Sequence, residues 1–148
     1  MYLHKGLRIL IIIFLFIMLV LVRAFELEMF YDPFIEYFKN DFLDKPIPVF
    51  SGSILLKDLF IRYSMNTIIS LTIIYFVFQN KNFVIFAIKF YVLAFIVLII
   101  TFFIILKGEL SNGYLFAFYI RRFIIHPLFV LLLLPAFYYK QLTSRQIN

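Results

Sequence analysis

The residues best suited to chemistry stand within long apolar stretches of the chain. Arg62, Asn66 and Ser70 recur at every fourth position of one such stretch. Because residues four apart lie on the same side of a helix, the three form one polar stripe, with Tyr63 and Thr67 beside it. Polar side chains within a membrane normally face other protein groups, with which they can form hydrogen bonds. The stripe is therefore predicted to face the protein interior, as part of a site for an anion or another polar group.

A second group of ionisable residues lies in the last apolar stretch. Arg122 and His126 are four residues apart and share a helix face, whereas Arg121 points about 100° away from Arg122. Pro127 removes the backbone donor for the carbonyl of Phe123, so a kink is expected there. His126 or a neighbouring hydroxyl could satisfy that carbonyl. We include both arginines and the histidine in the candidate site.

Two interpretations of the arginines remain open. In the first, their side chains extend outward to lipid headgroups. In the second, Arg62, Arg121 and Arg122 converge with carboxylates that follow the first apolar stretch, because ionisable groups inside membranes usually pair and face the protein. That arrangement would be a charge network or a site for an anionic headgroup or a C-terminal carboxylate. The candidate carboxylates are Glu26, Glu28 and Asp32. We predict that Arg122 faces the interior and pairs with Glu26 or Glu28.

An enzymatic role finds little support in these residues. His126 is the only general base within the apolar stretches, and Ser70 could lie at a similar depth. A serine nucleophile also needs a turn that exposes it and a site for the oxyanion, and neither motif is present. The sequence has no Cys, no HExxH motif and no phosphate-binding loop, so no metal, cofactor or nucleotide site is predicted. The positive charge lies beside and within apolar stretches, which argues against a nucleic-acid partner.

The composition identifies the elements that must hold these residues. Apolar residues make up 65% of the 148 residues and charged residues 15%, against about 45–50% and about 25% in soluble domains. A helix that spans a bilayer needs about 20 mostly apolar residues. We therefore predict a single integral membrane domain, residues 1–148, of the all-α class, in contact with the lipid bilayer. Its four transmembrane helices are expected at about residues 7–22, 59–79, 83–106 and 114–139.

The first apolar stretch allows a second interpretation. Lys5 and Arg8 precede it, and the tripeptide 22–24 that follows it loosely resembles a signal-peptide cleavage site. The apolar run is long for a signal peptide, however, and no soluble domain follows it. An uncleaved membrane anchor is therefore the preferred interpretation.

Residues 23–58 form one long connection in which aromatic residues alternate with carboxylates. Asp32-Pro33 is a favourable helix start, with Asp as the N-cap and Pro as the first helical residue. Phe34, Phe38 and Phe42 then recur at every fourth position. This pattern predicts a short interfacial helix with its aromatic face toward the membrane. Such a helix can be a lid packed on the end of the bundle or a docking surface for a partner.

The distribution of charge predicts an orientation. Four spans place both termini on the same side of the membrane. Lys and Arg are equally numerous on the two sides, but on the side of the termini they are concentrated in fewer residues, which is typical of the cytoplasmic side. All eight carboxylates fall on the other side. We therefore expect cytoplasmic N and C termini and an extracytoplasmic acidic connection.

Two blocks of the sequence resemble a known family. Residues 23–38 (RAFELEMFYDPFIEYF) and 119–139 (YIRRFIIHPLFVLLLLPAFYY) are similar to the exosortase F system-associated membrane proteins. These are small proteins of Bacteroidetes encoded next to a family F exosortase. The similarity extends over nearly the whole chain, including the four-span layout. Members of the family carry Gln at the place of His126, which weakens a catalytic role for that residue.

The resemblance implies a partner rather than an activity. Exosortases are multi-span transpeptidases that use Cys, Arg and His at the outer face of the inner membrane to process C-terminal sorting signals, and this chain has no Cys. The implied function is that of a non-enzymatic inner-membrane accessory protein, with a family F exosortase or its substrate as partner. The alternative is a subunit of a small transporter or channel, because charged residues inside spans often line a pathway. Four helices are too few for a carrier alone, so this alternative requires self-association.

Overall fold

A computed structural model describes residues 4–25, 52–107, 114–125 and 128–147, almost all of which are helical. No strand occurs in these ranges. A helix closes its backbone hydrogen bonds internally, which an apolar segment in hydrocarbon requires because no water is available there. The all-α prediction is confirmed for this part of the chain. The helices are α1 (Lys5–Ala24), α4 (Gly52–Phe78), α5 (Lys81–Lys107), α6 (Tyr114–Ile125) and α7 (Leu128–Ile147).

Three of these helices are long and apolar enough to cross a membrane, namely α1, α4 and α5 as far as Ile105. Helices α6 and α7 meet the same criterion only as a pair, and they are bent by 66° at the break between them. The kink predicted near Pro127 is therefore observed as a break between two helices. By length and composition, the described residues contain three helices that could cross a membrane, or four if the bent pair is one span.

Two helices extend beyond the limits predicted for their spans. Helix α4 begins at Gly52 rather than near residue 59, and its first turns contribute the buried Leu55 to the core. Packing against the other helices thus lengthens it into the segment predicted as a connection. Helix α7 continues past Tyr139 to Ile147 because the intervening residues include no Gly or Pro to end it. The interfacial helix predicted from Asp32-Pro33 lies outside the described residues.

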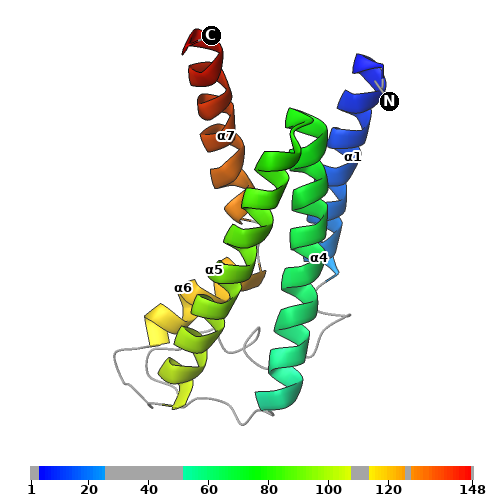
Figure 1. Ribbon diagram of the computed structural model, residues 1–148. Helices are drawn as coiled ribbons and strands as arrows, with labels where there is room; N and C mark the ends of the chain where they lie inside the picture. The colour runs from blue at the N-terminus through cyan, green and yellow to red at the C-terminus, as the bar shows by residue number, and fades with distance from the viewer. Residues whose placement is uncertain (1–3, 26–51, 108–113, 126–127, 148) are drawn as a thin grey trace.

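Helix α4 is the central element of the bundle, since it packs against each of the other four helices. Figure 1 shows that the N-terminus, the C-terminus and the turn between α4 and α5 lie at the same end of the molecule. Helix α6 lies toward the opposite end, beside the last turns of α5. This arrangement brings the middle of α4 next to the break between α6 and α7.

The turn between α4 and α5 explains why these helices form an antiparallel hairpin. Gln79 has a positive φ of 52°, the left-handed conformation that commonly follows the last residue of a helix. Its N–H donates to the carbonyl of Tyr75 at 2.8 Å. Asn80 then caps α5, because its Oδ1 accepts a hydrogen bond of 2.9 Å from the N–H of Asn82. The short polar turn therefore ends one helix and starts the next.

Aromatic rings fix α7 against this hairpin. Phe83 of α5 and Phe137 of α7 are stacked with ring centroids 4.8 Å apart, and Phe78 of α4 meets both rings edge-on. By contrast, α1 contributes only Leu19 to the buried core. The bundle thus consists of a packed group of α4, α5, α6 and α7, with α1 attached along one side of α4.

Candidate functional site

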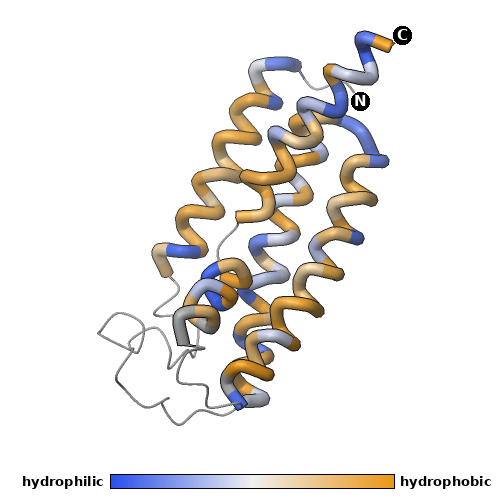
Figure 2. Tube along the Cα trace, turned by 90° about the vertical axis from the view of Figure 1, so that its left-hand side faces the viewer, coloured by the Kyte–Doolittle hydropathy of each residue, from blue (hydrophilic) through white to orange (hydrophobic). Residues whose placement is uncertain are grey.

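Helix α4 carries a buried polar face along its middle. Arg62, Asn66 and Ser70 are 2%, 5% and 0% exposed. The spacing of four residues predicted a shared face toward the interior, and the burial of all three confirms that orientation. Figure 2 shows blue, hydrophilic bands at the ends of the helices and in α6, within a bundle that is otherwise mostly orange.

The side-chain amide of Asn66 holds the end of α6. Its Nδ2 donates a hydrogen bond of 2.9 Å to the main-chain carbonyl of Ile125, the last residue of that helix. The last four carbonyls of a helix have no donor within the helix. In hydrocarbon, water cannot supply the missing donor. The break before α7 removes the donor that a continuous helix would supply, and the amide of Asn66 on α4 replaces it.

Two hydroxyl groups near Asn66 also donate hydrogen bonds to backbone carbonyls. Ser70 Oγ donates to the carbonyl of Asn66, one turn earlier in the same helix, at 2.6 Å. The hydroxyl of Tyr63 donates to the carbonyl of Tyr91 at 2.6 Å and so links α4 to α5. The two tyrosine rings also pack edge to face, with centroids 6.0 Å apart. The side-chain donors of this region thus serve to join helices or to bond within one.

In the middle of α4 and α5, three buried oxygen atoms keep unused hydrogen-bonding capacity. Asn66 Oδ1, Thr67 Oγ1 and the Tyr91 hydroxyl have no hydrogen-bond partner among the described residues. Amide oxygens accept hydrogen bonds, and hydroxyl groups both donate and accept them. Each of these three atoms could therefore take part in one further hydrogen bond.

The prediction that Arg122 faces the interior is wrong. Of the two arginines of α6, Arg122 is exposed and Arg121 is buried, at 7% exposure. The reason is the rotation of α6. Its carbonyl at Ile125 meets α4, and Arg121 precedes Ile125 by four residues, so it shares that face. Arg122 lies about 100° further round the helix and points outward.

The remaining candidates lie outside the described residues. These are His126 and the carboxylates Glu26, Glu28 and Asp32. A carboxylate partner for the arginines, and an anion site formed by them, therefore stay predictions. What the structure brings together is Arg62, Asn66 and Ser70 on α4 with Arg121 on the face of α6 that meets α4.

Sequence reasoning missed two groups that form this region. Tyr91 escaped notice because it stands in an apolar segment, although a hydroxyl in the middle of a transmembrane helix is itself a signal for a hydrogen bond. The side chain of Ile125 gives no indication that the backbone carbonyl of this residue needs a donor. Only the prediction of a kink at Pro127 pointed to unsatisfied backbone groups nearby, and it pointed to the carbonyl of Phe123.

No group of three or more potential metal ligands occurs among the residues that the structure describes. Comparisons with protein-family models, with curated proteins and with solved structures return no match. The residues and their geometry therefore carry the functional argument.

We predict that replacing Asn66 with Leu, which has a similar size but no donor, lowers the free energy of unfolding by about 1–3 kcal/mol. The cause is the unsatisfied carbonyl of Ile125 in a medium without water. Ser70→Ala is the matched control, because the hydroxyl bonds only within α4, and it should cost less than about 1 kcal/mol. Unfolding by SDS titration in lipid bicelles measures both. Equal losses for the two variants would contradict the role assigned to Asn66.

Our second prediction is that the two adjacent arginines of α6 differ in their effect on the amount of protein in membranes. Arg121→Met should lower the steady-state amount of protein in membranes, since it removes a buried side chain from the face that meets α4. Arg122→Met should have the smaller effect because this side chain is exposed. Immunoblots of isolated membranes, normalised to transcript, compare the two. A greater loss for Arg122→Met would show that the rotation of α6 is incorrect.

Proposed function

We propose that the chain is a non-enzymatic accessory protein of an exosortase-type protein-sorting system in the bacterial inner membrane. Its partner in this proposal is the exosortase or the exosortase's substrate. The resemblance of residues 23–38 and 119–139 to the exosortase F system-associated proteins motivates the partner. The absence of Cys from the sequence supports an accessory role, because the chain cannot supply the nucleophile that an exosortase uses.

The observation that carries an interaction role is the attachment of α1. Leu19 is the only buried residue of this helix, Leu15 and Phe16 are half-buried against the core, and most of the other large apolar side chains are exposed. Phe14, for example, is 56% exposed. A helix attached to a bundle along one side leaves its other sides available to lipid or to a transmembrane segment of another protein. The hydrogen bonds of Asn66 and Tyr63, by contrast, go to backbone carbonyls and support a structural role for the interior.

A transporter or channel subunit is the second candidate, and the break between α6 and α7 favours it. In many transporters, discontinuous helices end near the middle of the membrane, and their free backbone groups meet the transported ion or substrate. Here the carbonyl at the end of α6 meets Asn66 instead. The buried Arg62 and Arg121 still fit a charged pathway. Such a subunit would have to assemble with further copies.

Photocrosslinking in cells of the native species distinguishes the two functions. A photoreactive amino acid at Phe14 tests the exposed side of α1, and one at Leu93, which is 64% exposed on α5, is the matched control. The accessory function predicts an adduct from Phe14, absent from Leu93, that mass spectrometry identifies as a Cys-dependent transpeptidase or its substrate. Adducts between copies of this chain from either position would support the transporter subunit. No adduct with a sorting protein from Phe14 would contradict the accessory function.

We further propose that both termini are cytoplasmic. The end that holds the termini also holds the turn between α4 and α5 (Figure 1), and there Lys and Arg are concentrated in few residues. Because the chain has no Cys, single substitutions report without background. Ser144→Cys should resist an impermeant thiol reagent added to spheroplasts, whereas Ser53→Cys at the start of α4 should react. Both serines are exposed. The reverse labelling pattern would invert the orientation.

A further inference from the structure

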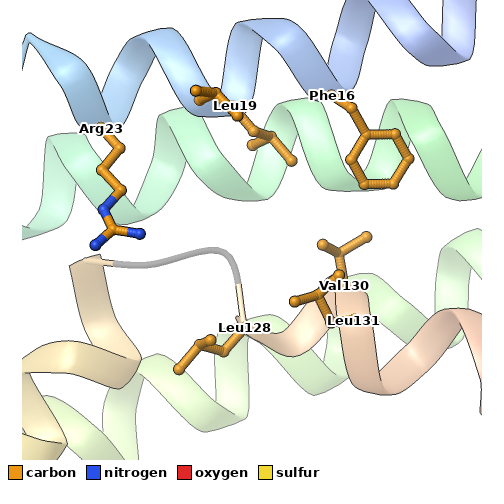
Figure 3. Close-up of a pocket in the computed structure, with 7 residues that line it drawn as sticks. Phe16, Leu19, Arg23, Leu128, Val130 and Leu131 are labelled. Carbon is orange, nitrogen blue, oxygen red and sulfur yellow. The ribbon is translucent and has the colours of Figure 1, made fainter.

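A polar cavity lies between helix α7 and the turn that joins α4 to α5, at the end of the molecule that holds both termini. Its volume is about 460 Å³, within the range of roughly 300–1,000 Å³ that is typical of sites for small ligands. Figure 3 shows a different cavity, between α1 and α7, whose labelled residues are apolar apart from Arg23. Amide, hydroxyl and ammonium groups contribute to the lining of the surface cavity beside the turn. The polar residues of this lining are Asn80, Asn82, Lys140, Gln141 and Ser144.

The turn places the surface cavity at the boundary of the membrane. Helices α4 and α5 are each long and apolar enough to cross a membrane, and they run in opposite directions from the turn (Figure 1). Hydrocarbon offers no water to backbone groups outside a helix, so a turn between two spanning helices lies beside the headgroups. Asn80 belongs to this turn, and Asn82 lies in the first turn of α5. Because both residues line the cavity, it lies at the level of the headgroups.

Aromatic packing fixes the wall of the cavity that α7 contributes. The ring of Phe137 is buried and stacks on Phe83 of α5, with centroids 4.8 Å apart. Lys140, Gln141 and Ser144 follow Phe137 by three, four and seven residues, so they share its face of α7. On both helices the aromatic residues of the lining lie on the membrane side of the polar ones. The cavity therefore has an aromatic part toward the hydrocarbon and a polar part toward the water.

Charge indicates the class of ligand. Lys140 is the one charged residue that lines the cavity in the described part of the chain. The sequence has no Asp or Glu at this end, in residues 1–8, 79–82 and 140–147. The side chains of Asn82, Lys140 and Gln141 form no hydrogen bond or ion pair with the described residues. An ammonium group and two amides can all donate to phosphate oxygens, so a phosphate group matches the lining.

We propose that the surface cavity binds the headgroup of one anionic phospholipid. The phosphate lies at Asn82, Lys140 and Gln141, and the glycerol ester region lies against Phe86, whose side chain is 55% exposed. Basic pockets between membrane helices bind anionic headgroups in this way. A zwitterionic headgroup would add an ammonium group, for which the described lining provides no carboxylate.

The aromatic part of the lining favours a lipid over a free phosphate ion. A free ion would contact only the polar part, whereas a phospholipid also contacts the rings that extend toward the hydrocarbon. The bound lipid would hold α7 to the hairpin of α4 and α5. This inference is independent of the partner proposed above, because none of the residues that line the cavity belongs to α1.

The test uses the full-length protein, reconstituted into vesicles of equal parts phosphatidylglycerol and phosphatidylethanolamine and then extracted in mild detergent. Native mass spectrometry counts the phospholipids that each chain retains. We expect one retained phosphatidylglycerol per chain, in preference to phosphatidylethanolamine. Excess inorganic phosphate should not displace it, because the ion makes no contact with the aromatic rings. Displacement would show that the cavity takes a free anion and would overturn the proposal.

Two matched pairs of variants test the charge of the lining. Lys140→Gln should reduce the retained phosphatidylglycerol about tenfold, as expected for the loss of one charge-assisted contact, and Lys140→Arg should restore it. Lys5→Gln removes an exposed charge outside the cavity and should change nothing. Gln141→Glu adds a carboxylate to the lining and should abolish the preference for phosphatidylglycerol. Gln146→Glu makes the same change at an exposed position of α7 outside the lining and should preserve it.

A third pair tests the location by size. Ala136 lines the cavity, so Ala136→Trp should exclude the lipid. Tyr139 is 73% exposed and lies outside the lining, so Tyr139→Trp should not. Equal retention by these two variants would place the lipid elsewhere and contradict the proposal. Equal retention of the two phospholipids by the unsubstituted protein would show only ordinary contact with bulk lipid, and would contradict it as well.

Discussion

The hydrogen bond from the Asn66 amide to the carbonyl of Ile125 is the contact on which the arrangement of this bundle depends. A helix that ends within hydrocarbon leaves backbone carbonyls without donors, and each must find one in the protein. Asn66 provides a donor from the middle of α4, the one helix that packs against all the others. By binding the last carbonyl of α6, it also sets the rotation of that helix. Arg121 is consequently buried and Arg122 is exposed.

The length of the apolar stretches was sufficient to predict three long helices, and the spacing of four residues predicted the buried face of α4. Arg62, Asn66 and Ser70 lie four residues apart in an apolar segment, and hydrocarbon leaves such a face only the protein interior. The rotation of α6 could not be predicted in this way. Two adjacent arginines occur at the same depth, and a break in the helix removes the continuous apolar face that would otherwise select between them. The selection depends on a backbone carbonyl, which has the same chemistry at every position of the sequence.

The polar groups inside the bundle and those at its periphery have different roles. Inside the bundle, Asn66 and Tyr63 direct their donors to backbone carbonyls of α6 and α5, so these polar groups hold the helices together. At the periphery, α1 has few contacts with the bundle beyond those with α4, and Arg23 at its end has no partner in the described residues. The proposed contact with another protein therefore uses the exposed side of α1, while the broken helix is stabilised from within.

Solid-state NMR in lipid bilayers tests the central contact directly. Protein labelled with ¹⁵N in Asn and with ¹³C in the carbonyl of Ile should show dipolar dephasing of the Asn66 side-chain amide, because a hydrogen-bonded nitrogen lies within about 4 Å of the carbonyl carbon. The Asn66→Leu variant identifies this signal by its absence. Dephasing of that signal is the result we predict. An Asn66 side-chain amide that does not dephase would show that α6 is held in another way, and the account of its rotation would fail.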